Sequence, residues 1–246
     1  MNDAEVSSAL GPNEERQLQE VVHELQQLYH GQLVAVFLYG SAARGNFIPG
    51  RSDLNLLIML QSVKLDDLGR AATLFRRWRK LKIAPLLMAA SELQSASRVF
   101  PLELSDVKEF GRLLYGSNPL AGIQIAPEHI RAQCRRELHG RLIRLRQEYL
   151  ELGDRRHALA GILAGALSSI LPVFRAVLRL GGAQVPTTDE AVVEAVVARH
   201  YLDRDLFTTV LAHKRGSRQL ATADHERLLG RLIGEWERLI ALVDAP

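Results

Sequence analysis

The chain has 246 residues, of which 47% are hydrophobic and 24% are charged, and its Lys and Arg residues outnumber its Asp and Glu residues by 31 to 28. This composition excludes a disordered chain, and the small net charge of +3 disfavours a nucleic-acid-binding protein, which would carry a larger and more clustered positive charge. Cys134 is the single cysteine, which excludes an intrachain disulfide and a cysteine-based zinc site and fits a reducing compartment.

The N-terminal region is expected to lead into an amphipathic helix. Residues 1–5 lack the basic segment and apolar core of a secretory signal, so we expect a cytoplasmic protein. We predict that residues 1–12 form a flexible N-terminus. Beyond them, Leu18, Val21 and Leu25 lie at helical spacing, which predicts a helix over residues 13–29.

Apolar runs that favour β-structure follow this helix. Those at residues 32–39 and 54–60 predict buried strands, and the glycines and proline between them predict a tightly turned connection. Helical spacing returns over residues 65–80. Apolar runs over residues 83–88 and 99–104 then complete a predicted sheet of about four strands.

Only helical patterns follow in the second half of the chain, so we place a domain boundary between residues 118 and 119. The predicted fold class is α+β: a mixed sheet with flanking helices over residues 13–118 and an all-α helical bundle over residues 119–246. The helices of the second domain are predicted at residues 128–152, 156–180, 189–201, 204–213 and 223–243.

Two of these helices allow more than one interpretation. The uncharged stretch 158–174 is short for a membrane span and contains glycine, serine and proline, so we expect a buried bundle helix and no membrane. The helix over residues 128–152 surrounds its apolar stripe with arginines, namely Arg131, Arg135, Arg136, Arg141, Arg144 and Arg146. They could line an anionic site, but a solvated helix surface is the commoner role, and binding of nucleic acid would rest on their charge alone.

The chemistry is concentrated in residues 37–58, which combine a strand, a Gly-Ser turn, a second glycine, a loop and a strand that opens with Ser-Asp. Because glycine has no Cβ, Gly40 and Gly45 let backbone N–H groups come close to phosphate oxygens. Ser41 can add a hydroxyl donor, and a helix beginning near Ser41 would add its free N-terminal amides. The pattern therefore predicts a triphosphate site.

The start of the second strand predicts a metal site. Asp53 and Asn55 are one residue apart, so on a strand their side chains share a face while Leu54 points into the core. Two carboxylates at this spacing would hold Mg²⁺, which prefers oxygen ligands and shares its shell with substrate phosphates. Here the second position is an amide, whose oxygen can ligate a metal but brings no charge.

This segment resembles the DNA polymerase β-like nucleotidyltransferase superfamily, whose pattern is Gly-Ser, a further Gly and then Asp-x-Asp or Asp-x-Glu. The resemblance covers residues 39–58 and implies that residues 13–118 form a nucleotidyltransferase-type domain. It implies that Gly40 and Ser41 bind the phosphates of ATP or another NTP, and that the following strand supplies metal ligands for nucleotidyl transfer. Arg44, Gly45 and Ser52 belong to the same segment and complete the expected nucleotide site.

The same resemblance implies a third acid on a later strand, for which residues 100–107 are the candidate segment. Glu103 is the preferred residue, so the expected Mg²⁺ ligands are Asp53, Asn55 and Glu103, with Asp53 and Glu103 as the catalytic acids. Asp106 is the alternative, although on a regular strand it would lie on the opposite face from Glu103. The helical half also resembles the substrate-side domain of aminoglycoside nucleotidyltransferases.

Asn55 leaves two functions open. Even at an effective dielectric of about 20, a unit charge at ligand distance is worth several kcal/mol, so its loss weakens metal binding. One hypothesis is a Mg²⁺-dependent transferase that moves a nucleoside monophosphate from an NTP to a hydroxyl of a small molecule or protein. The other is an antitoxin-like regulatory module that binds a nucleotide or a partner and has lost catalysis.

Overall fold

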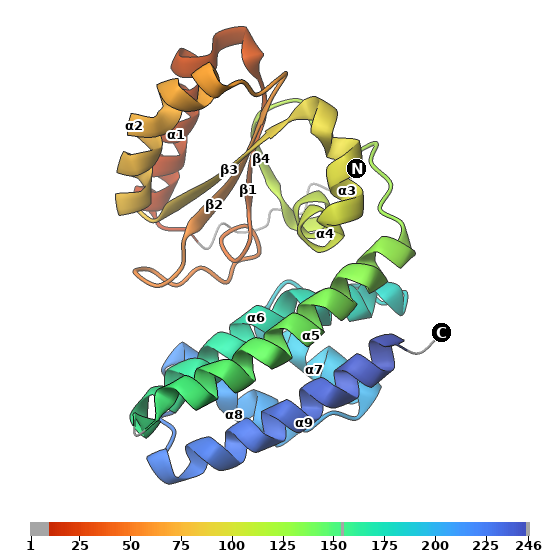
Figure 1. The fold of residues 1–246 in the computed structure, drawn as a ribbon. Helices are drawn as coiled ribbons and strands as arrows, with labels where there is room; N and C mark the ends of the chain where they lie inside the picture. Colours follow the sequence, from red (N-terminus) through yellow and green to blue (C-terminus); the bar gives the residue numbers. More distant parts are fainter. Residues whose placement is uncertain (1–9, 154, 245–246) are drawn as a thin grey trace. The chain divides into compact units, whose positions relative to one another are not determined.

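The computed structural model describes residues 10–153 and 155–244, and its contacts divide the chain into two compact units that meet between Ile125 and Ala126. The first unit contains α1 (Pro12–Tyr29), β1 (Leu33–Tyr39), β2 (Leu54–Leu60), α2 (Leu65–Lys80), β3 (Ile83–Ala89), α3 (Leu93–Val99), α4 (Pro101–Phe110) and β4 (Arg112–Gly116) (Figure 1). The second contains α5 (Pro127–Leu152), α6 (Leu159–Leu180), α7 (Asp189–His200), α8 (Arg204–Arg215) and α9 (His225–Asp244).

The four strands form one mixed sheet in the order β3-β2-β1-β4. β1 is antiparallel to both of its neighbours, β2 and β4, whereas β2 and β3 are parallel. β3 and β4 are therefore the edge strands. Pro85 lies within the edge strand β3, where it pairs in register with Leu56 of β2.

Helices cover both faces of the sheet (Figure 1). α1 and α2 pack on one face, where Leu25 and Trp78 meet Val36 of β1. α3 and α4 pack on the other face, where Phe37 belongs to the same buried cluster as Leu104. Alternate residues of β1 and β2 thus serve different cores, which is why both strands are apolar along their whole length.

The expected strand over residues 99–104 is wrong. Val99 ends α3, Pro101 begins α4, and the fourth strand is Arg112–Gly116. A proline at the first position of a helix loses no hydrogen bond, because an N–H group at that position has no intrahelical acceptor. Pro101 is therefore a signal for the start of a helix. The alternation Leu-Glu-Leu over residues 102–104 is too short to distinguish the two-residue period of a strand from the 3.6-residue period of a helix.

The boundary between the units lies at residue 125 rather than at residue 118. Leu120 is buried in the cluster beneath α3 and α4, and Ile123 and Ile125 pack against it, so the segment after β4 still belongs to the sheet unit. The N-terminus that we expected to be flexible lies, for residues 1–9, outside the described residues; Leu10 is already buried and Pro12 begins α1.

The second unit is a helical bundle, so the α+β fold class is confirmed. Its central helix, α6, packs against α5, α7, α8 and α9. By length and composition α6 is apolar enough to cross a membrane, with a mean hydropathy of 1.8 over 18 residues, and 61% of that window is buried in the structure. The burial of this helix among its neighbours accounts for its composition.

Candidate active site

The candidate site is built where β1 ends and β2 begins. Tyr39 and Asn55 are directly opposite each other in the β1–β2 register. Gly40 follows with a φ of +77°, and a Cβ added there would lie 2.5 Å from Nδ2 of Asn55. Both the left-handed backbone and this close approach require glycine, so the Gly-Ser turn and the amide at the second predicted ligand position are in contact.

No helix follows Gly40, contrary to the arrangement that we considered from the sequence. Residues 40–45 form a turn in which the Arg44 N–H donates to the Gly40 carbonyl at 3.3 Å and the Asn46 N–H donates to the Ser41 carbonyl at 2.8 Å. Gly45 has a φ of +76° within this turn. Any phosphate contact by the backbone therefore comes from a single turn rather than from a helix dipole.

A buried ion pair fixes this turn to α4. Nη1 of Arg44 lies 3.0 Å from Oδ2 of Asp106, and the two side chains are only 7% and 10% exposed. The side-chain amide of Asn46, itself buried, donates to the Arg44 carbonyl at 3.2 Å. The sequence placed Arg44 among the phosphate contacts and Asp106 as an alternative third acid; the structure pairs the two residues with each other.

The outer half of the loop is also held by its own polar groups. The hydroxyl of Ser52 accepts a hydrogen bond from the Ile48 N–H at 3.0 Å, while the Ser52 N–H donates to the Ile48 carbonyl at 2.8 Å. Nζ of Lys82, in the turn before β3, donates to the Gly50 carbonyl at 2.6 Å. Ser52 thus shapes the loop between Ile48 and Asp53.

Three of the predicted site residues keep their polar groups unused. Within residues 10–153 and 155–244, the side chains of Ser41, Asp53 and Asn55 have no hydrogen-bond or ion-pair partner. Asp53 is exposed immediately before β2, and Ser41 and Asn55 are half-buried. The polar groups beside Gly40 are therefore available to a ligand, in contrast to those of Arg44 and Ser52.

Glu103 lies in the first turn of α4 instead of on a strand, and its side chain is exposed. It is nevertheless near the site. Burial, together with the negative charge of Glu103, raises the pKa of Tyr39, whose side chain packs on the sheet face that α4 covers. Asp106, three residues later on the same helix, is buried against Arg44. Sequence reasoning missed Tyr39, which lies opposite Asn55 in the β1–β2 register and is near enough to Glu103 to feel its charge.

The donor set for a metal is incomplete compared with the superfamily pattern. The strand that pairs with β1 on its far side is β4, whose sequence Arg-Leu-Leu-Tyr-Gly contains no acid. No group of three His, Cys, Asp or Glu side chains is placed to hold a metal in the described part of the chain. Asp53, Asn55 and Glu103 offer the oxygen ligands that Mg²⁺ accepts, but only two of them carry charge.

The arginines of α5 are largely engaged on the helix surface. Arg135 pairs with Asp244 at 2.9 Å, Arg141 with Glu137 at 2.6 Å and Arg146 with Glu237 at 2.7 Å. These pairs support the interpretation of a charged helix surface.

Comparison with known proteins identifies the fold but not a family. No protein-family model matches the sequence, and no curated protein matches it. The structure resembles that of spectinomycin adenyltransferase AAD(9) from Enterococcus faecialis, crystallised with ATP and spectinomycin, with a TM-score of 0.61 and 12% identity over 91% of this chain and 99% of that one. A nucleotidyltransferase-like protein from Exiguobacterium sibiricum gives a TM-score of 0.40 at 13% identity, over 93% and 75% of the two chains. The likeness to AAD(9) shows that the chain has a nucleotidyltransferase-type fold.

Proposed function

We propose that this protein binds a nucleoside triphosphate at the Gly40–Ser41 turn and transfers its nucleoside monophosphate to a hydroxyl group of a small molecule. The observation that carries the proposal is the unused polar capacity of Ser41, Asp53 and Asn55 around a glycine turn that is itself fixed by a buried ion pair. Polar groups without partners beside a turn that a buried ion pair holds in place are available to bind a ligand.

Each residue has a role in this proposal. Gly40 and Gly45 shape the backbone that faces the phosphates, and Ser41 donates its hydroxyl to a phosphate oxygen. Asp53, with the amide oxygen of Asn55 and the carboxylate of Glu103, would hold Mg²⁺, which when bound neutralises charge on the triphosphate. Arg44 and Ser52 keep the loop in shape and contact no substrate.

The fold supports the acceptor class. AAD(9), which shares this fold over nearly its whole length, was crystallised with ATP and the small molecule spectinomycin. We infer that the acceptor of this protein is likewise a small hydroxylated molecule; a protein hydroxyl is the alternative acceptor class. Transfer of this kind depends chiefly on positioning and charge neutralisation.

The test is a pyrophosphate-release assay with the four NTPs, Mg²⁺ and a panel of hydroxylated acceptors. Asp53→Asn should abolish release, whereas Asp66→Asn, at an exposed aspartate on α2, should leave it unchanged. Asn55→Asp should strengthen Mg²⁺-dependent binding of ATP and raise turnover at least about tenfold, because it restores a full charge at ligand distance. Equal rates for Asp53→Asn and the native protein would rule out the role of Asp53.

A second function is favoured by Asn55 itself: a regulatory module that binds a nucleotide without turnover. The amide is where the superfamily has an acid, and β4, the strand that pairs with β1 on its far side, contains no acid. Calorimetry with ATP in Mg²⁺ and in EDTA separates the two functions. Metal-dependent binding supports the transferase, and metal-independent binding without pyrophosphate release supports the module. An absence of binding in both buffers excludes both.

A further inference from the structure

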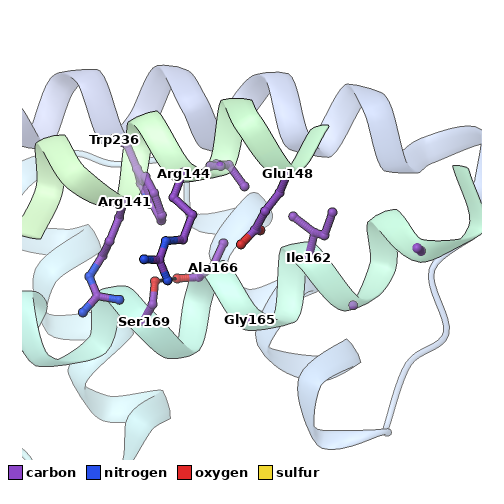
Figure 2. A pocket seen from close by; sticks show the side chains of 11 residues that line it. Arg141, Arg144, Glu148, Ile162, Gly165, Ala166, Ser169 and Trp236 are labelled. Atoms are coloured by element: carbon purple, nitrogen blue, oxygen red, sulfur yellow. Dashed lines mark hydrogen bonds between the residues drawn. The ribbon is translucent and has the colours of Figure 1, made fainter. Parts of the chain in front are cut away.

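A cavity of about 510 Å³, partly open to solvent, lies between α5, α6 and α9 of the helical unit. Arg141, Arg144 and Glu148 line it from α5, Gly161 and Gly165 from α6, and Trp236 from α9. Figure 2 shows Arg144 and Glu148 extending from α5 toward α6. The volume falls within the range of small-molecule sites, which is roughly 300–1,000 Å³.

The cavity exists because α6 carries glycine where it faces α5. Gly161 and Gly165 are one helical turn apart, and a Cβ added to either would meet no atom within 4 Å. Glycine in a helix interior is destabilising relative to alanine, and the usual compensation is close approach of a neighbouring helix. No close approach occurs at these two positions, so the glycines leave open space instead.

Two charged side chains without partners line this space. In the described part of the chain, the Arg144 guanidinium and the Glu148 carboxylate have no partner. Nε of Arg141 and Nε1 of Trp236 are buried and also lack an acceptor there, and the Trp236 side chain is only 1% exposed. These two nitrogens are closed off from the cavity as well as from solvent, so the group that can pair with an anion there is the exposed guanidinium of Arg144.

We propose that this cavity binds a small organic anion with one charged group, such as a carboxylate, sulfonate or monoester phosphate, on a ring-sized apolar body. The anionic group bonds to the Arg144 guanidinium, and the apolar body fills the space beside Gly161 and Gly165. Glu148 lies on the same side of the cavity and disfavours polyanions, which separates this ligand from the triphosphate proposed for the sheet unit. The proposal does not rest on the nucleotidyltransferase proposal.

The test uses two fluorescent probes that differ in one charged group. 8-Anilinonaphthalene-1-sulfonate is an apolar ring system with a single sulfonate, and N-phenyl-1-naphthylamine is the same ring system without it. Titration of the native protein should show one saturable site for the sulfonate, with binding about tenfold weaker or worse for the neutral probe because the charge-assisted hydrogen bonds are lost.

Two pairs of variants locate that site. Gly165→Leu fills the cavity and should abolish sulfonate binding, whereas Gly140→Leu places the same side chain at an exposed helical glycine of α5 outside the cavity. Arg144→Gln should weaken binding about tenfold, whereas Arg146→Gln, which breaks the surface pair with Glu237, should not. Circular dichroism melts establish that each variant is folded.

The proposal is overturned if the neutral probe binds as tightly as the sulfonate, or if both members of a pair have the same effect. If Gly165→Leu does not fold, the arginine pair still decides the question, because Arg144 and Arg146 are both exposed positions on one helix. Equal affinities for those two variants would exclude Arg144 as the group that binds the anion.

Discussion

Each compact unit buries an arginine–aspartate pair, but the two pairs join different kinds of segment. In the sheet unit, Arg44 and Asp106 tie an irregular turn to a helix. In the helical unit, Asp189 at the start of α7 faces Arg175 of α6 at 3.8 Å and Lys214 of α8 at 3.2 Å, so it ties three regular helices together. The helices would pack through their apolar faces without that charge, whereas the segment of the turn contributes only Ala42, Ala43 and Phe47 to a core. We therefore expect the first pair to matter for binding and the second for stability alone.

The largest effect is expected from Arg44→Met. Removal of one partner leaves the Asp106 carboxylate buried without its arginine, which should lower the free energy of unfolding by about 3–5 kcal/mol in urea titrations. The double variant Arg44→Met with Asp106→Leu removes both charges and should recover most of the stability. Binding of ATP, measured by calorimetry, should stay impaired in the double variant because the turn has lost its anchor. Native affinity in that variant would show that the pair is structural only.

Asp189→Asn should have a smaller effect and should sharpen the contrast. It removes the charge that faces Arg175 and Lys214 but keeps a hydrogen-bond acceptor, and Lys214 is near enough to solvent to turn outward, so we expect a cost of about 2 kcal/mol. ATP binding should be unchanged within error. A loss of ATP affinity as large as that in the Arg44 variants would remove the distinction between the two pairs.

Gly40→Ala tests the close approach of the turn to Asn55. A left-handed alanine is strained, and its Cβ would meet Nδ2 of Asn55, so the free energy of unfolding should fall by about 1–2 kcal/mol. Gly50→Ala is the matched control, because Gly50 has nearly the same φ of +74° and open space around it. The difference between the two variants measures the contact with Asn55. Equal losses in the free energy of unfolding would mean that a clash with Asn55 contributes nothing to the effect of Gly40→Ala.

The smallest effect concerns a partly exposed ion pair. Burial opposes ionisation of Asp203, but hydrogen bonds from Arg231 and from the Leu206 N–H outweigh it and lower the pKa of this carboxyl. The ionised Asp203 carboxyl therefore contributes its full stabilisation above the pKa of an Asp in the unfolded chain, about 4. This stabilisation is lost as the pH falls through the lower pKa that Asp203 has in the folded protein. Asp203→Asn keeps a good helix cap and should flatten the acid side of the stability profile, with little change at pH 7 beyond a loss of under about 1 kcal/mol. Melting temperatures from pH 7 to pH 2 check this.

Much of the fold follows from the pattern of the sequence. The strand at Leu54–Leu60 and the helix at Leu65–Lys80 have the predicted ends, because an uninterrupted apolar run and a clear helical stripe are strong signals. The segment from Leu93 to Gly116 was predicted poorly. Its helices are short, and β4 is a five-residue edge strand whose burial does not alternate cleanly. Periodicity has too few residues there to distinguish one element from another.

The candidate site was predictable in its loop and less so in its surroundings. The motif of the loop is local in sequence and contains Gly40, Ser41 and Asp53, so these residues could be recognised as candidates from the sequence alone. The partner of Arg44 lies 62 residues away, and no local rule connects those two positions. Glu103 came from a strand that does not exist, yet α4 places its charge near Tyr39. Roles that depend on contacts between distant elements need the tertiary structure.

The edge strand β3 has a consequence for the behaviour of the protein in concentrated solution. Leu86 is 44% exposed on this strand, and an apolar edge of this kind invites a strand of another chain to pair with it. Pro85 precedes Leu86 and has no N–H to donate, so an incoming strand cannot form a continuous ladder. Pro85 thus disfavours aggregation through the edge strand β3, while β3 remains paired with β2.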